Sequence, residues 1–145
     1  MQLTGSATFA ADRARVWDLL VDPARLGPCA PIVIEPAGAD RYSAKATLGI
    51  GLFSAVIRVD IEVLDIVPDS SVRIAAAGGA SGTNVACDVA LAMRPGPADG
   101  PVDVDWDLEV SATGMFGAQA VGLIERAAPN AIARLLDCLR GQIEG

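Results

Sequence analysis

The order of the hydrophobic patterns along the chain is the feature that most restricts how it can fold. From about Arg41 to Ala112, apolar and polar residues alternate as in strands that bury one face; from Phe116 to Ile143, the apolar residues recur at helical spacing. A sheet that buries one face needs a cover, and the final helix is the only predicted element long enough to provide it. The inward residues are mostly Ala, Val and Ile, which fill little volume. The pattern therefore predicts a container for something apolar between a curved sheet and one helix.

Length and charge narrow the class of protein. A chain of 145 residues is long enough for one domain, 1–145, with a sizeable core. The formal net charge of -7 argues against nucleic acid, whose phosphates need clustered Lys and Arg, and against electrostatic docking on anionic lipid. No apolar run approaches the roughly 20 residues of a membrane span. The opening MQLTGSATF lacks the charged leader and apolar core of a signal peptide, so we expect a cytoplasmic protein.

Four short elements are predicted before the main sheet. Residues 3–9 alternate as a strand, and Asp12 is placed to cap a short amphipathic helix. Asp22 and the proline after it favour the start of a second short helix, which ends near Gly27. Residues 32–35 then form a short strand, followed by a turn.

The main sheet and the last helix each present one apolar face. The inward residues of the predicted strands are Tyr42, Ala44, Ala46 and Leu48; Ile57, Val59, Ile61 and Val63; Val72, Ile74 and Ala76; Val85, Cys87, Val89, Leu91 and Met93; and Val102, Val104, Trp106, Leu108 and Val110. The helix stripe, at steps of three and four, is Val121, Ile124, Ala128, Ile132, Leu135 and Leu139.

Four stretches carry a resemblance to a known family. They are MQLTGSATF, RARVWDLLVDPARLGPCAP, LGIGLFSAVIRVDIEVLDI and GTNVACDVAL, and the second is the most specific. With the element order, they make the chain resemble the CoxG family of carbon monoxide dehydrogenase subunits, within the START-like, helix-grip (SRPBCC) superfamily. The resemblance implies an α+β helix-grip fold, with a curved antiparallel sheet wrapped around a long C-terminal helix and two short helices after the first strand.

The same resemblance implies a function. The family is linked to quinone binding and to membrane recruitment of a molybdenum-containing carbon monoxide dehydrogenase-type hydroxylase. Some members carry a long extra C-terminal segment, whereas this sequence stops at Gly145. We therefore expect a carrier or binding module whose membrane contact is at most peripheral.

The sequence contains few residues in the patterns that catalysis, metal binding or phosphate binding require. Histidine is absent, which removes the commonest general base and a leading metal ligand, and the glycines do not form a phosphate-binding loop. Residues 103–109 carry acidic side chains at every second position; a site for a hard cation is conceivable, but a solvated strand face is the simpler interpretation. We expect no catalytic residue and no metal site.

The three cysteines, Cys29, Cys87 and Cys138, are odd in number and widely spaced. We interpret them as buried thiols in a reducing cytoplasm. Cys29 lies between prolines, which suggests a rigid loop near the mouth of the container.

The predicted ligand site combines the inward sheet residues with the first half of the final helix. Trp106 is either a core residue or a cavity wall, and Phe53, Met115 and Phe116 are either a gate or ordinary packing. The predicted ligand-binding residues are Phe53, Ile57, Val59, Ile74, Ala76, Val85, Val89, Trp106, Leu108, Phe116, Val121, Ile124 and Ala128.

Three functions follow from these observations. The first is a non-enzymatic accessory protein that binds an apolar small molecule, a quinone or a lipid, in an internal cavity and associates with a molybdenum hydroxylase complex. The second is a cyclase-like enzyme of the same fold, which would need inward polar or acidic residues. The third is a docking or assembly factor for the hydroxylase that has no ligand.

Overall fold

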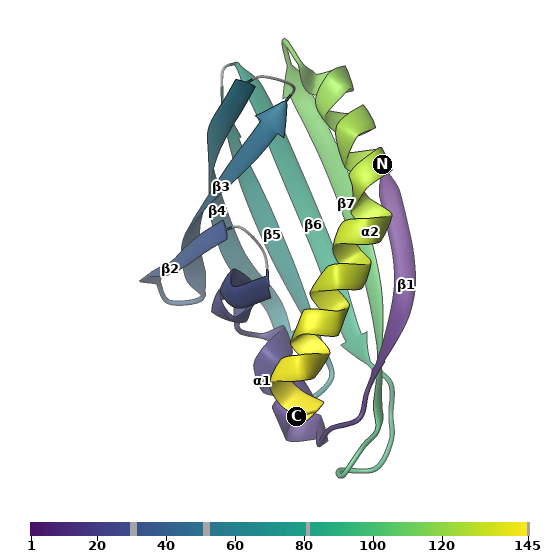
Figure 1. Ribbon diagram of the computed structural model, residues 1–145. Helices are drawn as coiled ribbons and strands as arrows, with labels where there is room; N and C mark the ends of the chain where they lie inside the picture. The colour runs from purple at the N-terminus through teal and green to yellow at the C-terminus, as the bar shows by residue number, and fades with distance from the viewer. Residues whose placement is uncertain (30–31, 51–52, 81, 145) are drawn as a thin grey trace.

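The computed structural model describes residues 1–29, 32–50, 53–80 and 82–144. All strands belong to one antiparallel sheet, in the order β1-β7-β6-β5-β4-β3-β2, and α2 lies across it (Figure 1). The elements are β1 (Gln2–Phe9), α1 (Arg13–Leu20), the 3-10 helix η1 (Pro23–Cys29), β2 (Ile32–Gly38), β3 (Arg41–Ile50), β4 (Phe53–Val67), β5 (Ser71–Ala80), β6 (Thr83–Met93), β7 (Val102–Gly114) and α2 (Gly117–Glu144). This is the predicted order of strands and helices.

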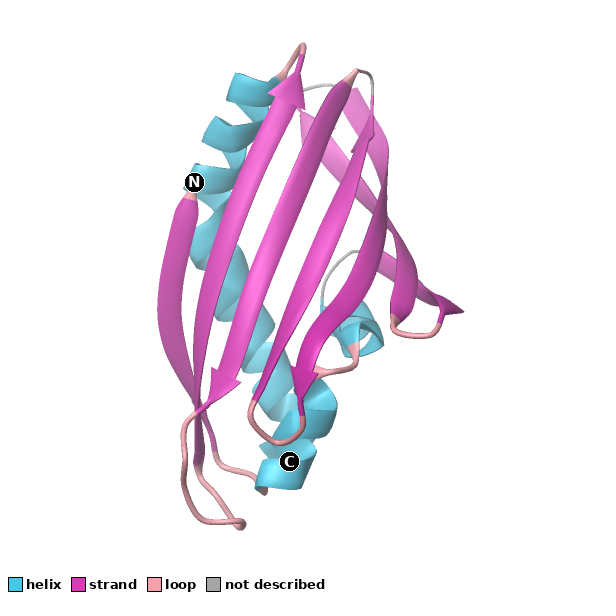
Figure 2. Ribbon diagram, turned by 180° about the vertical axis from the view of Figure 1, so that it is seen from behind, coloured by secondary structure: helices cyan, strands magenta, loops and turns pink. Residues whose placement is uncertain are grey.

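The register of the sheet places the predicted inward residues on one face. Val89 on β6 pairs with Ile74 on β5 and with Leu108 on β7, so the three side chains form a row across the sheet. Because side chains alternate along each strand, every second residue above and below this row shares the same face. We call this the inner face, since it is the one that α2 covers. Figure 2 shows the opposite, outer face, with α2 behind the strands.

Two of the short elements differ from the prediction. The strand expected to end at Glu35 continues through Pro36 to Gly38, with an irregular register between these two residues. Proline is tolerated there because β2 is an edge strand, where one side of the backbone needs no ladder donor. The second short helix is a 3-10 helix that contains Pro28. Asp22 caps the start of this helix, since Ala24 N donates to Asp22 Oδ1 at 3.2 Å.

The fully buried core occupies one end of the inner face. There the last turns of α2 and the helix α1 pack on the ends of the strands, and a hydrogen bond ties the end of β1 to the end of α2: Ala10 N donates to Glu144 Oε1 at 2.6 Å. Val16 and Val102 are almost completely enclosed there. The core cluster comprises Ala7, Phe9, Ala11, Val16, Leu19, Leu20, Val63, Val72, Met93, Val102, Val104, Leu139 and Ile143.

The helix α2 lies along one side of the sheet. Its contacts are concentrated on β7, with others to β1, β6 and η1. Figure 1 shows it over the β7 and β1 side, while β3 and β2 curl forward on the other side. The helix therefore grips the sheet near one edge, and the N-terminal half of α2 runs toward the end opposite the core.

A disulfide joins Cys29 at the end of η1 to Cys138 on α2, with the two Cα atoms 5.6 Å apart. The interpretation of these two residues as free thiols is therefore wrong. Gln142 supports the junction, because its Nε2 donates to the Arg25 carbonyl oxygen at 3.0 Å. The bridge also lies far from the start of α2: at about 1.5 Å per residue, about 30 Å of helix separates Gly117 from Cys138. Cys29 thus belongs to the core end of the molecule.

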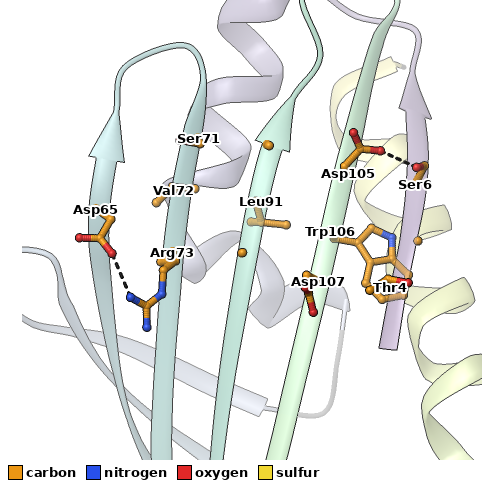
Figure 3. A pocket seen from close by; sticks show the side chains of 13 residues that line it. Thr4, Ser6, Asp65, Ser71, Val72, Arg73, Leu91, Asp105, Trp106 and Asp107 are labelled. Carbon is orange, nitrogen blue, oxygen red and sulfur yellow. Dashed lines mark hydrogen bonds and ion pairs between the residues drawn. The ribbon is translucent and has the colours of Figure 1, made fainter. Parts of the chain in front are cut away.

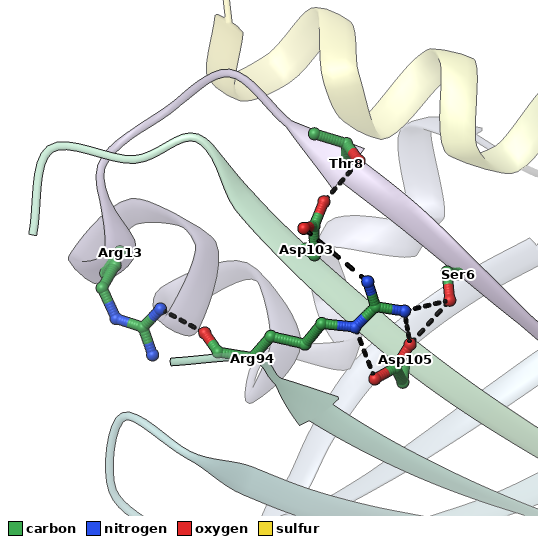
Figure 4. Close-up of polar contacts among 6 residues, drawn as sticks. All are labelled: Ser6, Thr8, Arg13, Arg94, Asp103 and Asp105. Carbon is green, nitrogen blue, oxygen red and sulfur yellow. Dashed lines mark hydrogen bonds and ion pairs between the residues drawn. The ribbon is translucent and has the colours of Figure 1, made fainter. Parts of the chain in front are cut away.

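The acidic residues of β7 lie on the outer face, as predicted. They do not only contact solvent, because two of them also form hydrogen bonds and ion pairs with neighbouring side chains. Asp103 accepts from Thr8 Oγ1 at 2.6 Å and Asp105 accepts from Ser6 Oγ at 2.6 Å (Figure 4). The Arg94 guanidinium donates to both oxygens of Asp105. Hydrogen bonds from Arg94 and then Ser6 lower the pKa of Asp105 to about 2, so this carboxylate stays ionised in moderately acidic solution.

Candidate functional site

Away from the core end, the inner face is apolar but incompletely covered. In the rows that contain Ile74, Ala76 and Val85, most of the inward side chains are only half-buried. By contrast, Met93, Val102 and Val104 nearer the core are enclosed. The row through Leu91 and Trp106 marks the change between the two regions. We refer to the half-buried part beyond this row as the open inner face.

The structure brings most of the predicted ligand-binding residues onto the open inner face and the adjoining half of α2. On the sheet these residues are Ile57, Val59, Ile74, Ala76, Val85, Val89 and Leu108, and all of them are half-buried. On α2, Val121 and Ile124 are half-buried and Ala128 is buried. Phe116 precedes the helix and is 50% exposed. The side chain of Phe53 lies outside the described residues.

Trp106 stands at the boundary between the core and the open inner face. Its ring reaches from β7 toward β1 (Figure 3), where it covers Gly5. A side chain at position 5 would clash with the indole, because a Cβ there would lie 2.7 Å from the ring atom Cε2. The indole Nε1 is buried without a hydrogen-bond partner. Glycine at position 5 thus makes room for the indole of Trp106.

Two polar side chains on the inner face were absent from the predicted site. Tyr42 pairs with Ile61, and its pKa is raised by burial and then by the charges of Asp22 and Asp40. Cys87 pairs with Ala76 and Val110. The alternation of the sequence had already placed both residues inward, so their register was the signal that could have added them. Together they supply a phenol and a thiol to a surface that is otherwise aliphatic.

Burial, and then the negative charge of Asp88, raises the pKa of the Cys87 thiol to about 11. We expect iodoacetamide to alkylate Cys87 about a hundredfold more slowly at pH 8 in the folded protein than an ordinary thiol, with the rate rising toward pH 11. Mass spectrometry of timed samples measures this rate, and the same protein in urea is the control. Without reductant the unfolded chain should gain one label, and with reductant three. An equal rate for the folded and unfolded thiol would contradict the buried position.

The outer face carries an open depression of about 600 Å³, drawn in Figure 3. Small side chains, among them Ala90 and Ala92, form part of its lining. The charged groups around it are paired with one another: Arg73 Nη1 donates to Asp65 Oδ2 at 3.0 Å, and Arg73 Nε donates to Asp88 Oδ1 at 3.1 Å. Because these charged groups are already paired within the protein, they are less available to a ligand. The open inner face is therefore the stronger candidate for a ligand site.

Among the described residues, no three or more His, Cys, Asp or Glu side chains gather to hold a metal ion. Nor does any of the helices described combine the length and hydropathy that crossing a bilayer requires.

A curved antiparallel sheet that grips a long C-terminal helix and lines its inner face with aliphatic side chains defines a START-like, helix-grip protein. The chain is similar to a START superfamily protein from Mycobacterium smegmatis (14% identity, TM-score 0.65, 99% of this chain and 97% of that one). It is also similar to a conserved protein from Geobacillus kaustophilus (21%, 0.80, 99% and 95%) and to the Zhui aromatase/cyclase from a Streptomyces species (15%, 0.65, 99% and 93%). At these identities the likeness establishes the fold.

The family is given by the sequence. The family model of the carbon monoxide dehydrogenase component CoxG matches residues 5–144, so the chain belongs to the CoxG family of carbon monoxide dehydrogenase subunits. No curated protein matches the chain. Family and fold together support a ligand-binding accessory protein, in a fold that an aromatase/cyclase also uses.

Proposed function

We propose that this protein is a non-enzymatic accessory protein that binds an apolar small molecule, a quinone or a lipid-like compound, against the open inner face. The ligand would contact the inward-facing sheet residues, from Ile57 on β4 to Leu108 on β7, and the first half of α2. In this role the protein serves a molybdenum-containing carbon monoxide dehydrogenase-type hydroxylase as a cytoplasmic partner. That location requires the bridge between Cys29 and Cys138 to withstand the reducing thiols of the compartment.

One observation supports the proposal most directly. A continuous set of aliphatic side chains on the inner face remains half-buried, although α2 lies over this face. A monomeric protein gains stability by enclosing such side chains, as it does at the core end with Val102 and Val104. Rows such as Ile74, Val89 and Leu108 stay partly accessible instead. An apolar ligand seated there would gain several kcal/mol before binding costs, at about 25 cal/mol per Å² buried.

The polar groups at this face favour a ligand with few hydrogen-bonding atoms. The Tyr42 hydroxyl can donate to a carbonyl oxygen, while the Cys87 thiol is a weak donor. The aliphatic residues around them suit a ring and a hydrocarbon chain. A quinone combines these features. The inward residues described contain no carboxylate and the whole chain contains no histidine, so the commonest general acid–base groups are missing from this face.

The direct test is to look for the ligand. Native mass spectrometry and solvent extraction of protein purified without detergent should recover an apolar compound, and titration with a quinone should quench tryptophan fluorescence. A Trp17→Phe variant leaves Trp106 as the single reporter next to the site. If no quinone or lipid is recovered or bound by the purified protein, the proposal is wrong and a docking role without a ligand takes its place.

Substituting Ala76 tests where the ligand lies. We expect Ala76→Trp to fill the open inner face, to weaken quinone binding strongly and to leave the melting temperature nearly unchanged. The matched control is Ala77→Trp, which adds the same side chain one residue later on the exposed outer face. It should bind quinone as the parent does. Fluorescence titration and thermal melting are measured on all three proteins. If position 76 is ordinary core, overpacking will cost roughly 1–3 kcal/mol of stability instead.

A further inference from the structure

The strand β1 forms one edge of the sheet, and half of its backbone groups point away from it. Met1 and Val110 exchange two hydrogen bonds, at 3.0 Å from Met1 N and at 2.9 Å from Val110 N. Bonded and non-bonded pairs alternate along an antiparallel ladder, so the odd-numbered residues of β1 bond to β7 and the even-numbered ones face outward. The Thr8 carbonyl oxygen confirms this direction, because it accepts from Arg140 Nε on α2.

Gln2, Thr4 and Ser6 form the open part of this edge. Their side chains are exposed, and no hydrogen bond among the described residues reaches their backbone N–H or carbonyl groups. Seen from either side, β1 lies at the outer margin of the sheet (Figure 1, Figure 2). In the monomer these backbone groups therefore bond to water. We call residues 2–6 the open edge.

The open edge lacks the features by which proteins block edge-to-edge pairing of sheets. The other edge strand, β2, carries Glu35, Pro36 and an irregular register, all of which discourage a further strand. By contrast, β1 contains no charged residue and no proline, and its register with β7 is unbroken from Gln2 to Phe9. The backbone of the open edge is therefore regular enough to continue the sheet.

The side chains of Gln2 and Ser6 lean back toward β7. Gln2 Nε2 donates to Asp107 Oδ1 at 3.0 Å, and Ser6 Oγ donates to Asp105 Oδ1 at 2.6 Å. These bonds leave the approach to the open edge clear. They also occupy acceptors of the neighbouring acidic row, so the edge has little need of a basic strand from another protein.

We propose that a second copy of this chain occupies the open edge, and that the two β1 strands pair antiparallel across a two-fold axis at Thr4. The outward residues are spaced evenly about Thr4, so the edge is complementary to itself. Gln2 of each copy exchanges hydrogen bonds with Ser6 of the other, and Thr4 pairs with Thr4. All outward backbone groups of both open edges are then bonded, which closes the assembly as a dimer.

The inner side of the same register brings apolar groups together. Leu3, which is half-buried, lies opposite Gly5 of the second copy. Because Trp106 covers this glycine within its own chain, the leucine meets the edge of the indole. A two-fold axis perpendicular to the sheet also places both open inner faces on one side of the dimer. This pairing goes beyond the proposed function and does not depend on a ligand.

Charge and contact area make the dimer weak and dependent on salt. The acidic rows of the two β7 strands lie three strand spacings apart, about 14 Å, whereas the Debye length at physiological salt is about 8 Å. Their repulsion is therefore small, and added salt reduces it further. One pair of short edges buries less than a standard interface of about 1,600 Å². We therefore expect dimers at high micromolar concentrations of the protein.

Sedimentation of ligand-free protein tests the proposal. Between about 10 and about 500 µM, the average mass of the parent should rise above that of one chain, and it should rise further at high salt. Thr4→Pro removes an N–H that points to the second copy and no bond to β7, so it should weaken dimerisation about tenfold or more. The matched control is Thr4→Val, which keeps the N–H and the shape of the side chain and should dimerise as the parent does.

Thr4→Glu repeats the test without a change to the backbone. It places two carboxylates opposite each other on the two-fold axis, so it should also weaken dimerisation about tenfold. Circular dichroism checks that each variant is folded, and Thr4→Glu decides the outcome if Thr4→Pro is not.

Hydrogen exchange locates the interface. As the concentration of the parent rises, exchange should slow at the amides of Gln2, Thr4 and Ser6. Exchange at Leu3 and Gly5 should not change, because β7 already bonds these amides. The proposal is overturned if the parent stays monomeric at about 500 µM. It is also overturned if the folded Thr4 variants all dimerise as the parent does, if Thr4→Val dissociates as well, or if the slowed amides lie outside the open edge.

Discussion

Replacing Cys138 with serine is expected to lower the free energy of unfolding by about 4 kcal/mol in oxidising buffer. The bridge to Cys29 spans a sequence separation of 109 residues, so it removes a large part of the conformational freedom of the unfolded chain. It also holds η1 against α2, where Gln142 bonds to the Arg25 carbonyl oxygen. Urea unfolding followed by circular dichroism measures the change as a shift of the midpoint.

Two controls distinguish the effect of losing the disulfide from the effect of losing a cysteine side chain. Cys87→Ala removes the thiol that is not in the bridge and should cost much less, on the order of 1 kcal/mol. Dithiothreitol should bring the parent protein down to the stability of Cys138→Ser and leave the variant unchanged. Equal midpoints for the parent with and without dithiothreitol would contradict the prediction.

Replacing Phe9 with alanine should cost about 3–5 kcal/mol of unfolding free energy. Phe9 ends β1, is 2% exposed and pairs with the enclosed Val102. The Arg140 guanidinium carbon lies 5.9 Å from the centre of its ring, and Arg140 Nε donates to the Thr8 carbonyl oxygen at 3.2 Å. Removing the ring therefore leaves a cavity at the junction of β1, β7 and α2 and takes away the face on which this cation packs.

The control for Phe9 is Phe116→Ala, which removes the same ring from a position that is 50% exposed. Its effect on unfolding free energy should stay within about 0.5 kcal/mol. Both variants are measured by urea unfolding with an unchanged slope against denaturant concentration. A loss below about 1 kcal/mol for Phe9→Ala would show that this end of the core repacks around the missing ring.

The sheet and the final helix could be predicted because their signals are local. Alternation along β6 fixes which side Val85 and Val89 face, and the change to helical spacing marks the start of α2 to within a residue. The family resemblance supplied the topology that periodicity alone leaves open. The residues of the candidate site were predicted for the same reason, since a face is a property of the strand itself.

The features that were missed depend on how distant elements meet. Cys29 and Cys138 lie near one another only because η1 packs against the C-terminal third of α2, which no sequence spacing reveals. Likewise, Ile74 and Val104 look alike in the sequence, yet Val104 is enclosed and Ile74 is not. That difference arises from the course of α2 along β7 and from the core that α1 completes at one end.

The disulfide also makes most of the molecule a covalent ring. All residues between Cys29 and Cys138 lie within it, whereas β1 and α1 form a tail outside. A protease that cuts the exposed loop between β6 and β7 would therefore leave a single nicked molecule of unchanged mass apart from one added water. The same cut placed before η1 would free β1 from every covalent tie to the ring, and only non-covalent contacts would hold it in place: its ladder with β7, its packing in the core and its hydrogen bonds to α2.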